Sequence, residues 1–170
     1  MAYMKRAEKP KSEFEQKTLE IRRVVRVVSG GRRFSFRVTV ALGDRKGRVG
    51  IGTAKGQDVA LAIEKAARQG KKHMIKILME DGTIPHEIEV KLKSARILLK
   101  PAKKGTGVIA GGAVRVVCDL AGIKNVVSKI LGKSTNKINI AEATIEAFKQ
   151  LKQRPQKKAP AAPVEAAKAI

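Results

Sequence analysis

Two glycine-bearing segments have residue types and spacings that resemble nucleotide-binding loops. Residues 105–110 read Gly-Thr-Gly-Val-Ile-Ala and match the G-x-G-x-x-A fingerprint, in which glycines let the backbone approach a pyrophosphate. The acidic residue that should follow about 20 positions later is missing, since Asp119 comes too early. Residues 132–135 read Gly-Lys-Ser-Thr, but Val127 stands where a P-loop needs its first glycine. We therefore interpret 105–110 as a loop for close packing or for an RNA phosphate.

Histidine and cysteine side chains are too few and too scattered for a metal or catalytic site. The only cysteine, Cys118, lies in the apolar run 116–118, which favours core packing. His73 and His86 are far from it in the sequence. Because zinc needs several converging ligands, the sequence predicts no metal and no cofactor, and neither enzymatic activity nor a small-molecule substrate. A single cysteine cannot form an internal disulfide, which suits a reducing compartment.

Basic residues are the strongest chemical signal. The chain has 37 Lys and Arg against 15 Asp and Glu, a net charge of +22. Such a charge destabilises a compact state unless a polyanion offsets it, so the sequence predicts a nucleic-acid partner. With no Trp, one Tyr and four Phe, stacking of unpaired bases on aromatic rings is not expected. Recognition of folded RNA by its backbone and shape fits better.

The positive charge is concentrated in the first half of the chain. Residues 21–76 carry 15 basic and 3 acidic side chains, whereas residues 77–150 carry 12 and 7. Guanidinium groups suit phosphate oxygens, and only Asp44 appears near eight arginines to balance them. We therefore favour a phosphate-binding surface over a merely solvated face. The eight are Arg22, Arg23, Arg26, Arg32, Arg33, Arg37, Arg45 and Arg48.

The elements that must position these arginines are strands followed by a helix. β-Branched residues in 19–28 predict a strand, and the glycine pair after Ser29 predicts a turn. Residues 33–42 alternate, which predicts a second strand with one face in the core and the other charged. After a basic turn comes a strand at 48–55, and a helical period begins near Asp58. The order β-β-β-α predicts a sheet covered by one helix.

The sequence pattern of the second half of the chain predicts a separate folded domain. The sequences of the two ends predict no folded structure. Gly82 and Pro85 indicate the boundary. The polar residues 1–17 predict a flexible arm, and residues 153–170 predict a disordered basic tail. No apolar run reaches the roughly 18 residues of a membrane span, and no signal peptide is apparent, so we expect a cytoplasmic protein. The expected elements are strands at 88–92 and 97–100, a helix at 108–121 ended by Gly122, a short strand within 123–131 and a helix at 139–151.

Six segments in unbroken order resemble the bacterial form of the small-subunit ribosomal protein five family. Together they span most of residues 18–151, and their order makes the resemblance specific although each motif alone would be weak. The segments are RVVSGGRRFSF (26–36), GDRKGRVGIGTAKG (43–56), GTIPHE (82–87), LLKPAKKGTGVIAGGAVR (98–115), AGIKNV (121–126) and INIAEATIEA (138–147).

The resemblance implies an α+β fold in two domains. Residues 18–80 would form a double-stranded-RNA-binding-like β-β-β-α domain without its leading helix. Residues 81–152 would form an α/β domain with a left-handed βαβ crossover, as in some small-molecule kinases. That kinship would account for the glycine loop without a nucleotide. Two alternatives stay open: a nucleotide-using kinase, which lacks its acidic residue and phosphate loop here, and a free double-stranded-RNA-binding regulator.

The resemblance also implies a structural place in the small ribosomal subunit. Expected partners are small-subunit rRNA, small-subunit ribosomal proteins four and eight, and mRNA near the path by which it enters, with a role in translational accuracy. The candidate RNA-binding residues are Arg22, Arg23, Arg26, Ser29, Gly30, Gly31, Arg32, Arg33, Arg37, Arg45, Lys46, Arg48, Lys55, Lys100, Lys103 and Lys104. The candidate protein-partner interface is Gly105, Gly107, Gly111, Gly112 and Arg115. Departures from the family pattern are Ser29 for a lysine, one extra residue near 133, Lys137 for a proline and Glu142 for a basic residue.

Overall fold

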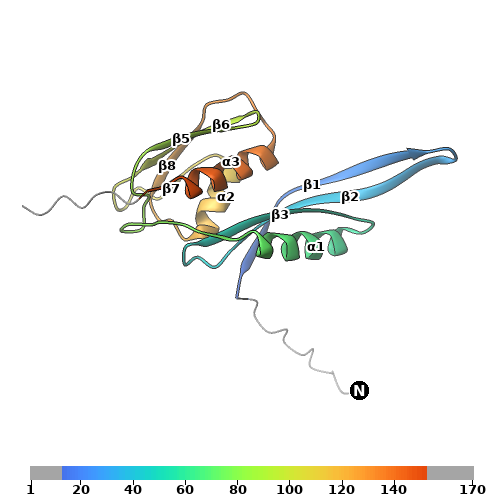
Figure 1. Cartoon of the computed structure of the whole chain (residues 1–170), viewed down its shortest axis with the longest axis horizontal. Coiled ribbons are helices and arrows are strands. Elements are labelled where there is room, and N and C mark those ends of the chain that lie inside the picture. The colour runs from blue at the N-terminus through green and yellow to red at the C-terminus, as the bar shows by residue number, and fades with distance from the viewer. Residues whose placement is uncertain (1–12, 153–170) are drawn as a thin grey trace, which may run out of the picture.

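Two four-stranded sheets and their helices make up residues 13–152, the part of the chain that this computed structural model describes. Figure 1 shows α1 against the first sheet, and α2 and α3 beside the second. The strand orders are β1-β2-β3-β4 and β5-β6-β8-β7, which confirms the α+β class. In chain order the elements are β1 (Glu15–Val28), β2 (Gly31–Gly43), β3 (Arg48–Gly56), α1 (Val59–Lys72), β4 (Ile75–Lys76), β5 (Ile88–Leu92), β6 (Ala95–Pro101), β7 (Val108–Ile109), α2 (Gly112–Ala121), β8 (Val126–Ile130) and α3 (Lys137–Lys149).

The first two strands form a hairpin that is longer than the sheet to which it belongs. β1 pairs with β2 from Glu15 to Val28, whereas β3 pairs with β2 only as far as Phe36. Beyond Phe36 the hairpin is therefore a two-stranded ribbon, and Figure 1 shows it projecting past α1. β1 begins inside the segment expected to be a flexible arm. Residues 1–12 of that arm, and the expected tail at 153–170, lie outside the described residues.

Helix α1 covers one face of the first sheet, as the sequence predicts. The Asp58 side chain accepts a hydrogen bond from the backbone N–H of Val59, which fixes the helix start. Glycines on β3 then allow a close approach: a Cβ at Gly52 would lie 2.0 Å from the carbonyl oxygen of Ala66. The buried side chains between the sheet and α1 are Val38, Val40, Leu42, Ala54, Ala62, Ala66 and Ala67.

The opposite face of the sheet is also buried at one end, which the sequence does not predict. Thr39 and Ala41 belong to the face expected to carry charge, yet they are 1% and 0% exposed. Ala41 and Val49 share a core cluster with residues of α2 and the second sheet. The prediction of a charged face is therefore wrong at this end, because the second half of the chain packs there.

The second sheet combines antiparallel strands with one parallel pair, β7 and β8. The predicted helix at 108–121 begins four residues late, at Gly112, because Val108 and Ile109 pair with β8 instead. The helix ends as expected: Gly122 has φ 87° and donates its N–H to the carbonyls of Cys118 and Asp119. The left hand of the βαβ crossover stays a prediction.

The two halves of the chain are joined through backbone contacts as well as side chains. The backbone N–H of Arg45 donates to the carbonyl of Leu120 at 3.0 Å, and that of Gly47 donates to Ala121 at 2.9 Å. Ile77 and Ile84, in the segment expected to be a boundary, are buried in the shared core. The strand β4, which precedes this segment, was not predicted; it pairs with β3 over two residues.

Candidate nucleic-acid interface

The strand register brings basic side chains face to face on the hairpin. Arg26 lies directly opposite Arg33, and Arg37 lies between Arg22 on β1 and Lys55 on β3. Residues that are directly opposed share a face of the sheet, as do residues four apart along a strand. All five cations therefore lie on one face, which we call the basic face. It is the same face that the second half of the chain covers near Ala41.

Three of the eight candidate arginines form ion pairs with acidic side chains. Two of these three pairs do not involve Asp44, the acidic partner that the sequence suggested. Arg22 pairs with Glu20 at 2.8 Å, and Arg45 pairs with Glu15 at 2.7 Å. Only the pairing of Arg48 with Asp44, at 2.7 Å, was anticipated. Among the described residues, the ion pairs include none with Arg26, Arg33 or Arg37. Lys55 also has no ion pair among them, so these three arginines and Lys55 are the uncompensated charges of the basic face.

The candidate RNA-binding residues of the first domain include both turns of the sheet as well as the strands between them. Residues 29–33 lie at the β1–β2 turn, whereas Arg45, Lys46 and Arg48 lie at the β2–β3 turn. The whole length of β2 separates these turns, which at about 3.3 Å per residue is roughly 40 Å. The eight candidate arginines thus lie on one small sheet and its two turns, and the length of β2 sets the distance between the turns.

Asp44 organises the β2–β3 turn. Its carboxylate accepts hydrogen bonds from the backbone N–H groups of Lys46 and Arg48, at 2.7 and 2.9 Å, and from Arg48 Nε at 2.7 Å. Burial of Asp44 favours the neutral acid, but these hydrogen bonds and the charge of Arg48 outweigh burial and lower its pKa below the ordinary value. The turn is thus built around an internal carboxylate, which neutralises part of its positive charge.

The glycine loop that resembles a nucleotide fingerprint is closed by a side chain that sequence reasoning missed. Asn125 is 7% exposed, and its Oδ1 accepts the backbone N–H groups of Gly105 and Gly107, both at 3.1 Å. In a nucleotide-binding loop, backbone N–H groups of this kind would bind a phosphate. Here both N–H groups already donate to Asn125, so their hydrogen bonds are satisfied within the chain. Asn125 lies within the AGIKNV segment, where its amide was the only available signal.

The remaining candidate residues of the second domain lie around this loop. Lys100 pairs with Glu87 at 3.1 Å, whereas Lys103 and Lys104 are exposed in the loop itself. Gly111 precedes α2, and Arg115 is exposed on its first turn. The five residues of the expected partner interface therefore occupy one loop and the helix start that follows it.

Two of the departures from the family pattern have local explanations. Glu142 pairs with Lys93 Nζ at 2.7 Å, so its charge is used within the chain. Lys137 is the first residue of α3, and the side chain of Asn136 caps this helix by accepting the N–H of Ile138 at 3.1 Å. A proline is favoured at such a position but is not needed when the cap is present.

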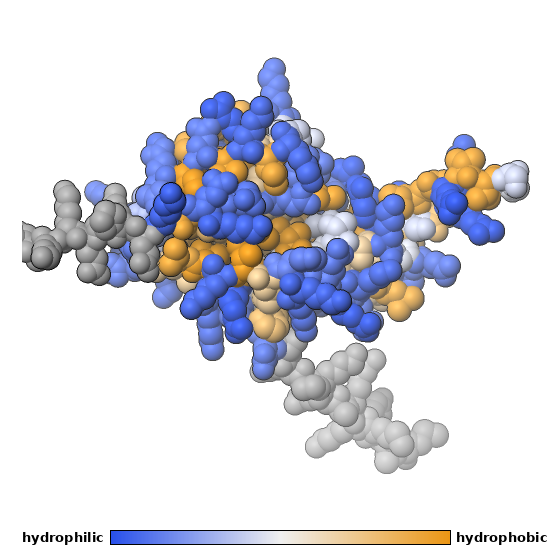
Figure 2. All heavy atoms as spheres, in the orientation of Figure 1, coloured by the Kyte–Doolittle hydropathy of each residue, from blue (hydrophilic) through white to orange (hydrophobic). Residues whose placement is uncertain are grey.

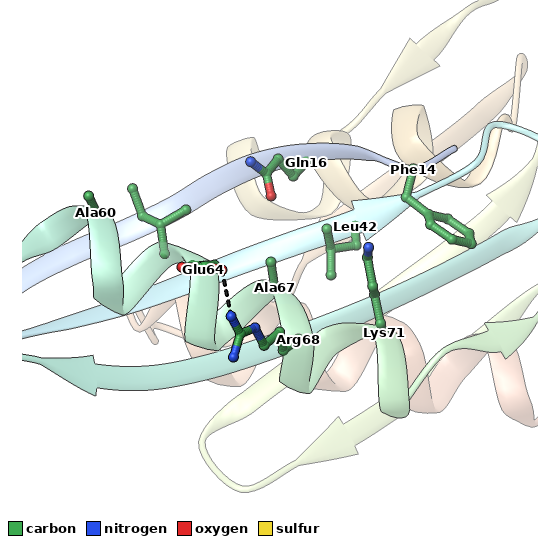
Figure 3. A pocket seen from close by; sticks show the side chains of 9 residues that line it. Phe14, Gln16, Leu42, Ala60, Glu64, Ala67, Arg68 and Lys71 are labelled. Atoms are coloured by element: carbon green, nitrogen blue, oxygen red, sulfur yellow. Dashed lines mark hydrogen bonds and ion pairs between the residues drawn. The ribbon is translucent and has the colours of Figure 1, made fainter. Parts of the chain in front are cut away.

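A shallow groove of about 520 Å³ runs between β1 and α1. Figure 3 shows Phe14 and Lys71 at one end and the ion pair of Arg68 with Glu64, at 2.6 Å, along its edge. Its floor is formed by small and apolar side chains such as Ala67 and Leu42. Arg68 and Glu64 on its edge are thus already paired with each other, and the Nζ of Lys71 lies 5.6 Å from the centroid of the Phe14 ring.

Other chemistry is limited within residues 13–152. No cluster of three or more His, Cys, Asp or Glu side chains there could hold a metal ion. Burial raises the pKa of the Cys118 thiol to about 12, helped by the charge of Asp119, so the thiol stays protonated in the core as predicted. No helix in this part of the chain is long and apolar enough to cross a membrane.

The fold and this surface define a two-sheet α+β protein whose projecting hairpin carries unpaired arginines. Residues 14–78 match the family described as ribosomal protein S5, N-terminal domain, and residues 90–159 match ribosomal protein S5, C-terminal domain. The chain belongs to the ribosomal protein S5 family.

Curated relatives agree with this membership. The chain is 49% identical over 143 residues to small ribosomal subunit protein uS5 of Thermus thermophilus, an alignment that covers 84% of this chain and 88% of that protein. It is 50% identical over 139 residues to the uS5 protein of Thermotoga neapolitana, covering 82% and 78%, and 49% identical over 138 residues to that of Persephonella marina, covering 81% and 71%. The chain is therefore a structural ribosomal protein of the cytoplasm rather than an enzyme, which rules out the kinase alternative.

Proposed function

We propose that this protein is a constituent of the small ribosomal subunit that binds small-subunit rRNA through the basic face of its hairpin. The observation that carries the proposal is the row of unpaired Arg26, Arg33 and Arg37 on a ribbon that projects beyond the folded core. Guanidinium groups bind phosphate oxygens in pairs of hydrogen bonds, and a narrow ribbon can follow an RNA backbone. The RNA would supply the negative charge that the chain lacks.

The geometry of the hairpin tip supports the same proposal. A Cβ added at Gly30 or Gly31 would meet nothing within 4 Å, and Gly31 has φ 136°. The backbone at the tip is therefore open, so that an RNA strand could approach closely between Arg32 and Ser29. Lys46 and its neighbours at the other turn would meet a second stretch of RNA.

We further propose that the division into domains at 18–80 and 81–152 separates two kinds of contact. The second domain would face small-subunit proteins four and eight through Gly105, Gly107, Gly111, Gly112 and Arg115. The whole protein would help to line the path by which mRNA enters and would support translational accuracy. The exposed Arg115, which has no ion pair among those of the described residues, is suited to an acidic or carbonyl-rich partner.

Filter binding to folded small-subunit rRNA tests the RNA contact. The double variant Arg26→Gln, Arg33→Gln removes two opposed guanidinium groups. Losing two charged hydrogen bonds at about 1.5–3 kcal/mol each should weaken binding by roughly 3 kcal/mol or more. The slope of log affinity against log salt should flatten by about 0.7–0.9 for each phosphate that the variant no longer neutralises.

The control is the double variant Arg68→Gln, Arg96→Gln, which changes the net charge by the same amount. Both of these arginines are paired, with Glu64 and Glu89, and neither lies on the hairpin. The control should therefore bind rRNA almost as tightly as the original chain. Equal losses for the two double variants would show that only total charge matters, and the assignment of the basic face would then be wrong.

A further inference from the structure

The face of the hairpin opposite the basic face is unusually apolar for an exposed ribbon. Figure 2 shows hydrophobic side chains gathered along the projecting hairpin, with hydrophilic ones between them. Val25 lies opposite Phe34 in the register, and the two are 47% and 50% exposed. Ile21 and Val27, at 49% and 76%, continue the same face along β1. We call this set of side chains the apolar face.

An aromatic ring at the centre of the apolar face is already stacked on one cation. The guanidinium carbon of Arg23 lies 4.7 Å from the centroid of the Phe34 ring, a favourable cation–π distance. Half of the Phe34 surface nevertheless stays accessible. The Phe34 ring is therefore held in place by Arg23 and is still open to solvent, so that a second planar group could stack on it.

We propose that Phe34 receives an unpaired base of small-subunit rRNA, with Arg23 and Val25 beside it. Unpaired bases stack on aromatic rings and on guanidinium planes in many RNA complexes. The inference rests on the proposed function, since it assigns a second contact to the same hairpin. It also revises the expectation that base stacking is not used: the aromatic side chains are few, but one is exposed on the ribbon.

The charge around the apolar face favours an RNA base over an apolar protein surface as the partner of this face. Residues 21–37 contain six arginines and no acidic residue. Arg23 and Arg32 lie on the apolar face itself, because Arg23 is two residues from Val25 along β1 and Arg32 is opposite Val27. Burying these cations against an apolar protein would leave them without partners, at a large desolvation cost. A nucleotide supplies both an apolar ring face and a neighbouring phosphate.

The test uses the full chain, folded small-subunit rRNA and the variant Phe34→Leu. Leucine keeps the apolar bulk and removes the ring, so the fold should be preserved. We expect affinity in filter binding to fall about tenfold, within the range seen when one stacked base is lost. The salt dependence should stay unchanged, because every phosphate-binding cation is kept. Ultraviolet irradiation of the original complex should cross-link a nucleotide to Phe34, identified by mass spectrometry in the tryptic peptide of residues 34–37.

Leu131→Ala is the control, because Leu131 is also a half-exposed apolar side chain, at 46%, but it follows β8 in the second sheet rather than lying on the hairpin. Leu131→Ala should bind with the original affinity. Unchanged binding by Phe34→Leu, or a cross-link confined to other residues, would overturn the base platform while the basic face could still bind RNA. A flattened salt slope for Phe34→Leu would also overturn it, since the ring would then be acting through phosphate contacts. Failure of the original chain to bind rRNA at all would overturn the proposed function and this inference together.

Discussion

Substituting Gly43 by alanine should destabilise the joint between the two halves of the chain. A Cβ at this position would lie 2.1 Å from the carbonyl oxygen of Leu120 and 2.8 Å from its Cβ, so β2 or α2 must move. Overpacking of this kind costs about 1–3 kcal/mol. The movement would also strain the two backbone hydrogen bonds from Arg45 and Gly47, worth about 1 kcal/mol each. We expect a loss of roughly 3–5 kcal/mol, a large share of the ~5–15 kcal/mol typical of a folded protein.

Urea unfolding followed by far-ultraviolet circular dichroism measures this loss. The control is Gly112→Ala, where the added Cβ meets nothing within 4 Å and the residue lies in a helix. That variant should match or slightly exceed the original stability, by up to about 1 kcal/mol. A loss below about 1 kcal/mol for Gly43→Ala would refute the reasoning, because it would mean that the halves separate or slide at little cost.

Two further predictions concern a carboxylate and an exposed arginine. The pKa of Asp44 is lower in the folded chain than in the unfolded chain, so the ionised group stabilises the fold above its unfolded pKa, near 4, and this contribution is lost as pH falls through the folded pKa. Asp44→Asn should therefore narrow the difference in stability between pH 6 and pH 3, as measured by urea unfolding at about those two values. An unchanged difference would contradict the role of the Asp44 carboxylate in the turn. Arg115→Leu should raise missense and stop-codon reading in reporter assays while the protein still enters the subunit, and Arg115→Lys should raise it less because it keeps the charge. Error rates for Arg115→Leu equal to those of the original chain, at normal incorporation, would contradict the proposed role in accuracy.

The strands of the hairpin and helix α1 were predictable because their signals are local. The alternation in 33–42 depends only on the pleat, and Asp58 marks the helix start by its side-chain chemistry. The same local signals could not reveal that Ala41 is buried, because it packs in one core cluster with residues about 80 positions later in the sequence. Alternation identifies two faces but does not say what covers each one.

The start of α2 and the role of Asn125 were missed for a related reason. Val108 and Ile109 are compatible with a helix or a strand, and their pairing with β8 decides the outcome. Asn125 acts on Gly105 and Gly107, 18 to 20 residues away, through a side chain that no spacing rule associates with a loop. At Gly107 the backbone conformation favours glycine, since φ is 74°, although an added Cβ would meet nothing within 4 Å.

Strand β2 joins the stable core to the proposed RNA contact and keeps the two at separate places. At residues 38–42 both faces of the strand are buried, one by α1 and the other by the second half of the chain, so this end is fixed in position by two packed layers. At residues 31–35 the side chains are largely exposed, and the strand pairs only with β1. A continuous strand transmits the rigidity of its buried end to its exposed end, because a paired ribbon bends far less than a loop of the same length. Basic and aromatic groups can therefore be presented well beyond the core without the ordering cost of a flexible arm, which favours tight contact with a structured RNA.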